Sequence, residues 1–426
     1  MVVVGGGLAG CWAALSAAGA GADVTLVRRA LGATAVSSGA LDVVPPAEAA
    51  DPQGWLRRLE RDHPRHPFLA GGAPPSLAEL EVELTALATA LMDAGLRLRV
   101  DLRAPVLVAA TTGQVRAAGV VQQTIAAGDL RGRGRVAVAG IAGLHRVDAG
   151  AVAAGIAERV PGVHTQAVTV ALLRGEGGDP ADLDEPTVAR LVEAPGGAER
   201  LGQAIRAELN VARGDVDVVL VPPVLGLDDA GAVLARVEGA LGSAVGELLA
   251  PPPSAPGWRL QRALERALGA APITVVSGAV TGLRTAGERV EAALVDAGEV
   301  VCDAVVLAGG RFLGGGLSLD ARPREPLLDL PVFAGEREVG ELARADLVSR
   351  ANYREQPVLA AGLRLNAGCR PVDRFGVAPW ANVVACGALL AGIDSSLGAG
   401  GLGVVAWSAG RAGRAAAALA GAAVTP

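Results

Sequence analysis

Residues 2–29 read VVVGGGLAGCWAALSAAGAGADVTLVRR, and this stretch decides the fold. Its opening valines, residues 2–4, form a short apolar run, and the alanine-rich segment 8–18 after the glycines suits a helix. Residues 23–27 then alternate and are rich in β-branched side chains, which is typical of a strand. The order strand, glycine turn, helix and strand predicts the opening of an α/β nucleotide-binding domain.

Three glycines between the first strand and the helix, Gly5, Gly7 and Gly10, have the spacing G-x-G-x-x-G. In such a turn the first glycine permits the tight bend, the second lets a phosphate approach the backbone, and the third lets the helix pack on the strand. The N-terminus of the helix offers free N–H groups and a positive dipole end. These glycines therefore predict a bound phosphorylated cofactor.

The end of the second strand departs from this pattern. Dinucleotide sites usually carry an acid there, about 20 residues after the glycines, to bind the ribose hydroxyls. This chain has Arg28 followed by Arg29. Three interpretations stay open: the arginine binds a 2′-phosphate as in NADP sites, it is a solvated charge on a relic of the motif, or the cofactor lacks adenosine.

Composition excludes several classes of function. The 426 residues carry a formal net charge of −6, and the chain has no lysine, so that arginine carries all of the formal positive charge and no broad basic surface for nucleic acid is expected. No run of apolar residues predicts a membrane span and no signal segment precedes the first strand, so we expect a cytoplasmic protein. The 4 cysteines are scattered, without spacing for zinc or an iron–sulfur cluster, and we expect buried thiols and no metal.

The chain as a whole predicts an α/β fold with a Rossmann-like flavin-binding domain, discontinuous in sequence, and a smaller inserted α/β domain. Strands at RVAVAGI, HTQAVTVALL and VDVVLVPP alternate with helical segments in the insert, and the clustered prolines of LLAPPPSAPGW end it. We expect residues 1–103 and 257–426 to form the flavin-binding domain and residues 104–256 to form the insert.

Glycine-rich segments in the last third of the chain favour a flavin over a nicotinamide, because a flavin needs close approach of backbone. One is VVLAGG, which ends a strand; another is NVVACGALLAGID; a third precedes the last helix, whose N-terminus would place positive potential beside the flavin. The cofactor-binding residues expected in them are Gly309, Gly310, Gly387, Asp394, Gly400 and Gly401.

Several strings resemble the B subunit of anaerobic glycerol-3-phosphate dehydrogenase. They are GGGLAG, SSGALD, the His66–Pro67 pair, AGIAGL, LAGGRFLGGGL, REP and CGALLAGID, and they occur in the same order along essentially the whole chain. The resemblance implies oxidation of glycerol 3-phosphate to dihydroxyacetone phosphate, with electrons passed toward quinone. It adds Ser37, Ser38 and Gly39 of SSGALD to the cofactor-binding residues.

The resemblance also implies a cofactor and partners. The family's B subunit is a flavoprotein that joins an FAD-bearing A subunit, while a C subunit with iron–sulfur clusters ties the pair to the membrane and to quinone. The expected cofactor is FMN, with FAD as the alternative. FMN has no adenosine, so an FMN site would not need the ribose-binding acid whose place Arg28 takes.

Oxidation of a secondary alcohol needs a base for the hydroxyl proton and a cation for the phosphate. His66 and His145 are the catalytic candidates, and Arg324 and Arg370 are the candidates for the substrate phosphate, with Arg146 and Arg311 behind them. Two other functions stay open: a flavin-bearing electron-relay or assembly subunit with no substrate site, and a general FAD-dependent oxidoreductase. An NADP-dependent reductase is less favoured, because no second G-x-G-x-x-G occurs in a strand–turn–helix setting.

Overall fold

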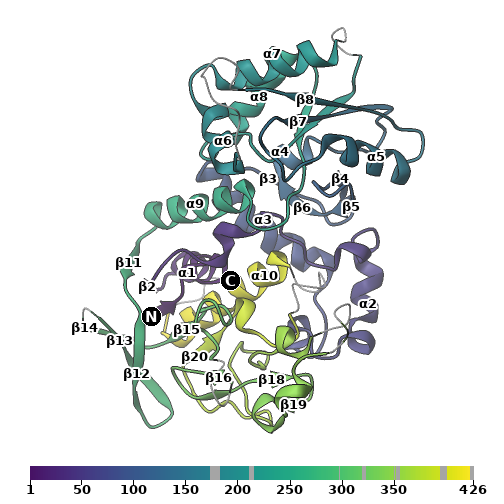
Figure 1. The fold of residues 1–426 in the computed structure, drawn as a ribbon. Helices are drawn as coiled ribbons and strands as arrows, with labels where there is room; N and C mark the ends of the chain where they lie inside the picture. Colours follow the sequence, from purple (N-terminus) through teal and green to yellow (C-terminus); the bar gives the residue numbers. More distant parts are fainter. Residues whose placement is uncertain are drawn as a thin grey trace. The chain divides into compact units, whose positions relative to one another are not determined.

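The computed structural model describes residues 1–172, 183–210, 215–296, 298–318, 323–349, 351, 356–393 and 401–422. Two of the predicted site residues, Asp394 and Gly400, lie outside these ranges. The chain divides into two compact units (Figure 1). The first unit comprises residues 1–34, 41–90 and 264–426, and the second comprises residues 35–40 and 91–263.

A five-stranded sheet with the order β11-β2-β1-β15-β20 forms the centre of the first unit (Figure 1). All neighbouring strands are parallel, so their carboxyl ends meet at one edge, and the glycine turn follows the central strand there. Val2 and Val3 of the central strand are fully buried. The five strands are β1 (Val2–Val4), β2 (Val24–Arg28), β11 (Ile273–Ser277), β15 (Val305–Leu307) and β20 (Val383–Ala385).

Helix α1 (Leu8–Gly19) packs against α10 (Leu402–Leu419) at backbone distance. A Cβ atom on Gly413 of α10 would overlap the carbonyl oxygen of Ala13 in α1. A buried carboxylate joins a third helix, α3 (Leu77–Asp93), to this pair: Glu83 accepts a hydrogen bond from Trp12 at 2.6 Å and pairs with Arg414 at 2.5 Å. The three helices are thereby fixed to one another.

Helix α3 begins where the sequence predicts. The Ser76 hydroxyl accepts from the Glu79 amide at 3.2 Å, and Glu79 accepts from the Ser76 amide at 2.8 Å, which is a reciprocal capping box.

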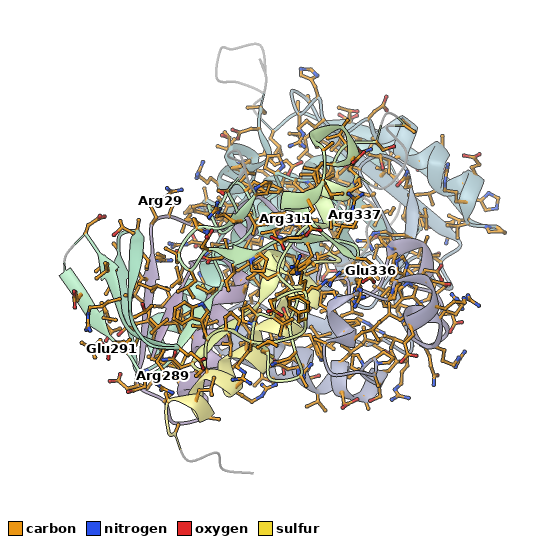
Figure 2. The ribbon with its side chains drawn as sticks, turned by 90° about the horizontal axis from the view of Figure 1, so that it is seen from below. Arg29, Arg289, Glu291, Arg311, Glu336 and Arg337 are labelled. Carbon is orange, nitrogen blue, oxygen red and sulfur yellow. The ribbon has the colours of Figure 1, made fainter. Side chains whose placement is uncertain are left out.

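Smaller elements complete the first unit. Strands β12 (Val280–Ala286), β13 (Arg289–Val295) and β14 (Gly298–Val301) form an antiparallel sheet, with Arg289 and Glu291 on β13 (Figure 2). The first unit also contains helix α2 (Pro52–Asp62), the short strands β16 (Arg324–Glu325), β17 (Leu330–Pro331), β18 (Phe333–Ala334) and β19 (Arg337–Glu338), and short 3-10 helices.

The second unit is also an α/β unit, built on a parallel sheet with the order β10-β9-β7-β8. Alternate residues of β7 face opposite layers: Val136 and Val138 pack on α5, whereas Ala137 and Ala139 belong to the core beneath α6, α7 and α8. Its main strands are β7 (Arg135–Ile141), β8 (His164–Val170), β9 (Val218–Val221) and β10 (Val245–Glu247), and its helices are α4 (Gln123–Ala126), α5 (Ala149–Arg159), α6 (Glu185–Glu193), α7 (Gly197–Leu209) and α8 (Ala230–Leu241). The predicted strands of the insert are confirmed.

The second unit extends beyond the predicted insert of residues 104–256. Its added N-terminal residues include β3 (Leu98–Val100), which pairs with β6 (Val120–Gln122) inside the unit. Two further strands, β4 (Val106–Ala109) and β5 (Val115–Ala118), form a hairpin. Helix α9 (Ala255–Ala270) begins in the second unit and ends in the first.

A buried ion pair organises the interior of the second unit. The Arg259 guanidinium binds both carboxylate oxygens of Glu247, at 2.6 and 2.8 Å, and the two side chains are 2% and 0% exposed. Glu247 also accepts from the Leu225 amide, while Arg259 donates to the carbonyl of Gly226. Each charge is thus compensated where it is buried.

All 4 cysteines are free and buried, as expected of small buried thiols. Among the described residues, no helix is long and apolar enough to cross a membrane.

The contact between α1 and α10 leads to a prediction. Gly413→Ala should lower the free energy of unfolding of the first unit by roughly 1–3 kcal/mol, because the added methyl meets backbone that cannot rotate away. Gly269→Ala, at a helical position of α9 with open space around it, is the control and should stabilise by up to about 1 kcal/mol. Urea unfolding followed by tryptophan fluorescence measures both, and equal effects would contradict the close contact.

Candidate functional site

The glycine turn holds helix α1 against strand β1 at backbone distance. Gly5 has a φ of +127°, which L-residues with side chains rarely adopt. A Cβ atom on Gly5 would overlap the carbonyl oxygen of Ala308, and one on Gly10 would overlap that of Gly5. Packing therefore requires glycine at both positions.

Gly7 is different, because packing of the chain does not require a glycine there. A Cβ atom on Gly7 would lie 3.5 Å from Gly32 and from the Thr34 hydroxyl, which is ordinary van der Waals contact. Packing within the chain therefore does not account for the glycine at this position. This is the position at which the G-x-G-x-x-G motif brings a phosphate to the helix.

The N-terminus of α1 carries no side-chain cap of its own. Gly7 is the N-cap, no acid occurs in the first turn, and the Leu8 amide donates to the Thr34 hydroxyl at 2.8 Å. Helix α10 is similar: Gly401 is its N-cap, and the Gly403 amide donates to the carbonyl of Asp42 at 3.0 Å. By contrast, an aspartate caps each of α2, α5, α6 and α8, namely Asp51, Asp148, Asp184 and Asp229. Helix ends that begin with glycine and have no acid in the first turn suit an anion.

The comparison with known protein families agrees with this geometry. A family model described as "FAD binding domain" matches residues 1–404. The chain belongs to this family.

Curated relatives match along nearly the whole chain. The B subunit of anaerobic glycerol-3-phosphate dehydrogenase from Yersinia enterocolitica is 28% identical over 92% of this chain and 92% of its own length. A probable B subunit of the same enzyme from Halobacterium salinarum is 28% identical over 95% of this chain and 94% of its own length. The resemblance predicted from the sequence is confirmed.

A solved structure, 3-ketosteroid delta1-dehydrogenase from Sterolibacterium denitrificans, aligns over 99% of both chains at 13% identity, with a TM-score of 0.37. That similarity is too low for any inference about function.

The family changes the expected cofactor. The sequence favoured FMN, whereas the family description names FAD, so the comparisons support the alternative and not the first choice. The residues fit an FAD diphosphate, because packing of the chain does not account for the glycine at position 7 and the start of α1 lacks an acid.

Arg28, which takes the place of the usual ribose-binding acid, is paired with a carboxylate. Its guanidinium lies 2.7 Å from Glu265 of α9, and the two side chains are 24% and 19% exposed. Its stem crosses the glycine turn, since a Cβ atom on Gly6 would lie 2.8 Å from the Cβ and Cδ of Arg28. The neighbouring Arg29 is exposed (Figure 2).

The Ser37–Gly39 segment is grouped with the second unit. The Ser37 and Ser38 hydroxyls accept from the backbone amides of Gly39 and Ala40, at 3.3 and 3.4 Å. The carbonyl of Ser37 accepts from the Ser254 hydroxyl at 2.7 Å. These contacts hold the segment as a turn, and its role at a cofactor stays a prediction.

The other predicted cofactor glycines follow the ends of β15 and β20. Gly309 and Gly310 begin a tight loop after β15. Gly387 follows β20 and would collide with Ala9 of α1 if it had a Cβ. Arg311, a secondary candidate for the substrate phosphate, instead donates to the carbonyls of Ala388 and Ile393 at 3.1 and 2.6 Å.

His66 lies in a buried aromatic cluster and is 3% exposed. The Phe68 amide donates to its Nδ1 at 3.2 Å, and the Trp55 ring centroid is 5.3 Å away. Burial, and to a smaller extent the charge of His63, lowers the pKa of His66 to about 3. The ring is therefore neutral at physiological pH.

Because Nδ1 accepts, the proton of this neutral ring is on Nε2. The Nε2 atom is buried and has no hydrogen-bond partner among the described residues. Gly392, in the predicted flavin segment, packs against the backbone of Arg65 and His66. His66 thus offers an N–H donor beside that segment, and its only lone pair is already engaged.

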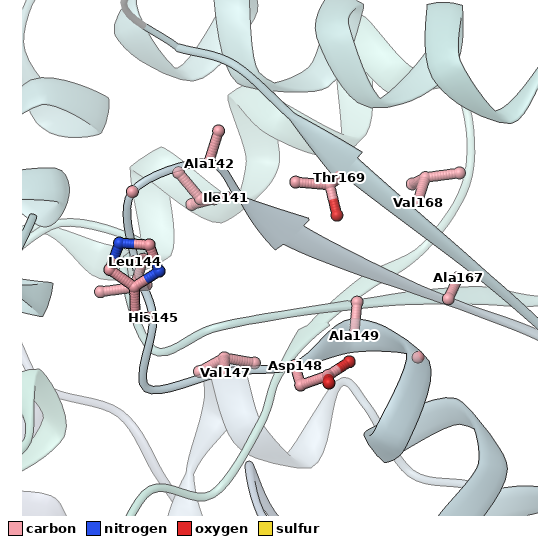
Figure 3. Close-up of a pocket in the computed structure, with 12 residues that line it drawn as sticks. Ile141, Ala142, Leu144, His145, Val147, Asp148, Ala149, Ala167, Val168 and Thr169 are labelled. Carbon is pink, nitrogen blue, oxygen red and sulfur yellow. The ribbon is translucent and has the colours of Figure 1, made fainter. Parts of the chain in front are cut away.

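His145 lies in the second unit, at a cavity of about 500 Å³. Figure 3 shows its ring on the loop after β7, with Asp148 at the start of α5 and Thr169 on β8. Asp148 is occupied as the cap of α5, because it accepts from the Ala151 amide at 3.0 Å. His145 and its neighbour Arg146 are both exposed. His66 and His145 belong to different units, and a catalytic role for either stays a prediction.

The two phosphate candidates differ in their partners. Arg324 forms an ion pair with Asp329 and is 41% exposed. Arg370 is half-buried, and among the described residues its guanidinium contacts no acid, carbonyl or ring. Its backbone amide donates to the side-chain carbonyl of Asn366 at 3.1 Å. Arg370 is thus the better placed to bind an anion.

Sequence reasoning missed two residues of this site. Thr34 meets the start of α1, and the only signal for it is a hydroxyl residue shortly after the second strand. Glu265 meets Arg28 from 237 positions further along the chain, and no local pattern connects the two.

The buried His66 leads to a pH-dependence prediction. Its pKa in the folded protein lies below the unfolded value, so the stability it contributes is fully present above about pH 6.5 and declines as the pH falls toward about 3. From about pH 7 to about pH 5, the free energy of unfolding of the wild type should fall by about 2 kcal/mol more than that of His66→Asn, which keeps an acceptor for the Phe68 amide.

Urea unfolding at the two pH values measures this difference. His145→Asn, at an exposed histidine, is the control and should follow the wild type. Identical pH slopes for His66→Asn and the wild type would show that His66 is not buried in its neutral form.

Proposed function

We propose that this chain binds FAD and serves as the B subunit of a quinone-linked sn-glycerol-3-phosphate dehydrogenase. The observation that carries the proposal is the full-length similarity to subunits of that name, combined with membership of the FAD-binding family. The glycine turn supports it, because Gly7 and the start of α1 fit a diphosphate.

The reaction is oxidation of the C2 alcohol of glycerol 3-phosphate to the ketone of dihydroxyacetone phosphate. Bound FAD would supply the hydride acceptor. The chain contributes Gly7 and the N-terminus of α1 for the cofactor diphosphate, with Gly309, Gly310, Gly387 and Gly401 near the flavin. In our proposal Arg370 binds the substrate phosphate, because its guanidinium has no partner within the described part of the chain.

In our proposal the residue that takes the hydroxyl proton is not His66. His66, the one histidine that is buried, holds its proton on Nε2 and has its lone pair engaged by Phe68. We propose that His66 orients a polar group through this N–H and does not act as the base.

This geometry favours a second candidate function. A chain without a basic histidine at the flavin can relay electrons from a partner's flavin without a substrate site. The partners in either case are the FAD-bearing A subunit and the iron–sulfur C subunit, and association with the membrane would occur through the latter.

The first experiment identifies the cofactor. Flavin released from the purified, denatured chain should run as FAD on chromatography. Anaerobic addition of glycerol 3-phosphate to the flavin-loaded chain should then bleach the flavin absorbance. Bleaching of the isolated chain supports the dehydrogenase, and bleaching only with the A subunit supports the relay. FMN or no flavin would overturn the proposed FAD site.

A substitution tests the substrate site. Arg370→Gln should raise the KM for glycerol 3-phosphate about 10- to 100-fold in the assembled enzyme, through loss of a charged hydrogen bond to phosphate. The kcat should change little, because binding of the phosphate is uniform along the reaction. Arg374→Gln, at an exposed arginine paired with Glu341, is the control. A KM equal to that of the control would exclude Arg370 from the site.

A further inference from the structure

The end of strand β2 presents a charge arrangement that the motif does not predict. Arg28 ends the strand, and its NH1 lies 2.7 Å from Oε1 of Glu265 on α9. Both side chains are mostly buried yet partly exposed, at 24% and 19%. A carboxylate is therefore present at the end of β2, although the residue of the strand itself is a cation.

An arginine cannot perform the usual task of the acid at this position. The guanidinium has five N–H donors and no acceptor, so it cannot accept a hydrogen bond from a ribose hydroxyl. A carboxylate has about four acceptor sites on its two oxygens. Arg28 donates to Oε1 of Glu265, and in this pair it is the carboxylate, not the guanidinium, that can accept a hydrogen bond.

The stem of Arg28 also lies against the glycine turn that precedes α1. The charges of Arg28 and Glu265 act with opposite sign on the thiol of Cys11, in the first turns of α1. Gly6, which the G-x-G-x-x-G spacing does not require, gives the Arg28 stem its path across the turn. Leu264 and Leu268, on either side of Glu265 in α9, are buried and anchor that helix.

We propose that Glu265 binds the adenosine ribose of FAD and that Arg28 is a positioning residue that holds this carboxylate in place. The inference rests on the proposed FAD binding and adds the residue that selects FAD over FMN. It also disfavours the interpretation of Arg28 as a ligand for a 2′-phosphate, because the neighbouring carboxylate would repel that phosphate.

The test compares the affinity of the flavin-stripped chain for FAD and for FMN by fluorescence titration. Glu265→Gln should weaken FAD binding about 10- to 100-fold and leave FMN binding unchanged, because FMN has no adenosine. Glu291→Gln removes an exposed negative charge from β13 in the same unit and should leave both affinities unchanged. The double variant Arg28→Glu/Glu265→Arg returns the carboxylate to β2 and should restore FAD binding to within about threefold of the wild type.

A measurement on the wild type does not depend on the folding of any variant. FAD should bind at least about 10-fold more tightly than its 2′-deoxyadenosine analogue, which lacks one ribose hydroxyl. Equal affinity for the two, or equal losses of FAD and FMN binding in Glu265→Gln, would overturn the role of Glu265. A wild-type chain that binds FMN and not FAD would overturn the proposed FAD site itself.

Discussion

The close approach of α1 to its neighbours is the constraint on which the first unit depends. On one side the helix starts against the carbonyl of Gly5, where only Gly10 leaves room. On the other side Gly413 of α10 meets the carbonyl of Ala13. Aromatic residues make up 2% of the chain, so large rings cannot fill gaps between elements. Backbones at contact distance supply the dense packing instead.

This packing also determines where charge is placed. A helix held on both sides cannot shift, so its N-terminal amides keep one direction at the carboxyl edge of the sheet. Aspartates cap four other helices, yet α1 and α10 begin with glycine and have no acid in the first turn. The overall charge of −6 gives no sign of this difference between the helices, because it depends on where the acidic residues stand in the sequence and not on how many there are.

Elements defined by short-range patterns could be predicted from the sequence. The opening strand, turn and helix, the capping box of Ser76 and Glu79, and the strands of the second unit each follow from spacing within about 20 residues. The contacts between distant segments could not be predicted in this way. Nothing local connects Arg28 to Glu265, or Ser37 to Ser254, because folding alone brings these residues together.

The position of Arg28 shows the consequence of this limit. The missing acid after the second strand leaves three interpretations open, one of them a cofactor without adenosine, and FMN is implied only by the resemblance to the B subunit. A sequence motif, however, specifies only one position in the chain for the acid. A ribose can bind a carboxylate from any segment that reaches the same place. In a parallel sheet the end of β2 is also within reach of the helix that leads into its neighbour β11, and Glu265 is on that helix. With Arg28 at the end of β2, a carboxylate is thus still present there, and the cationic side chain pairs with it.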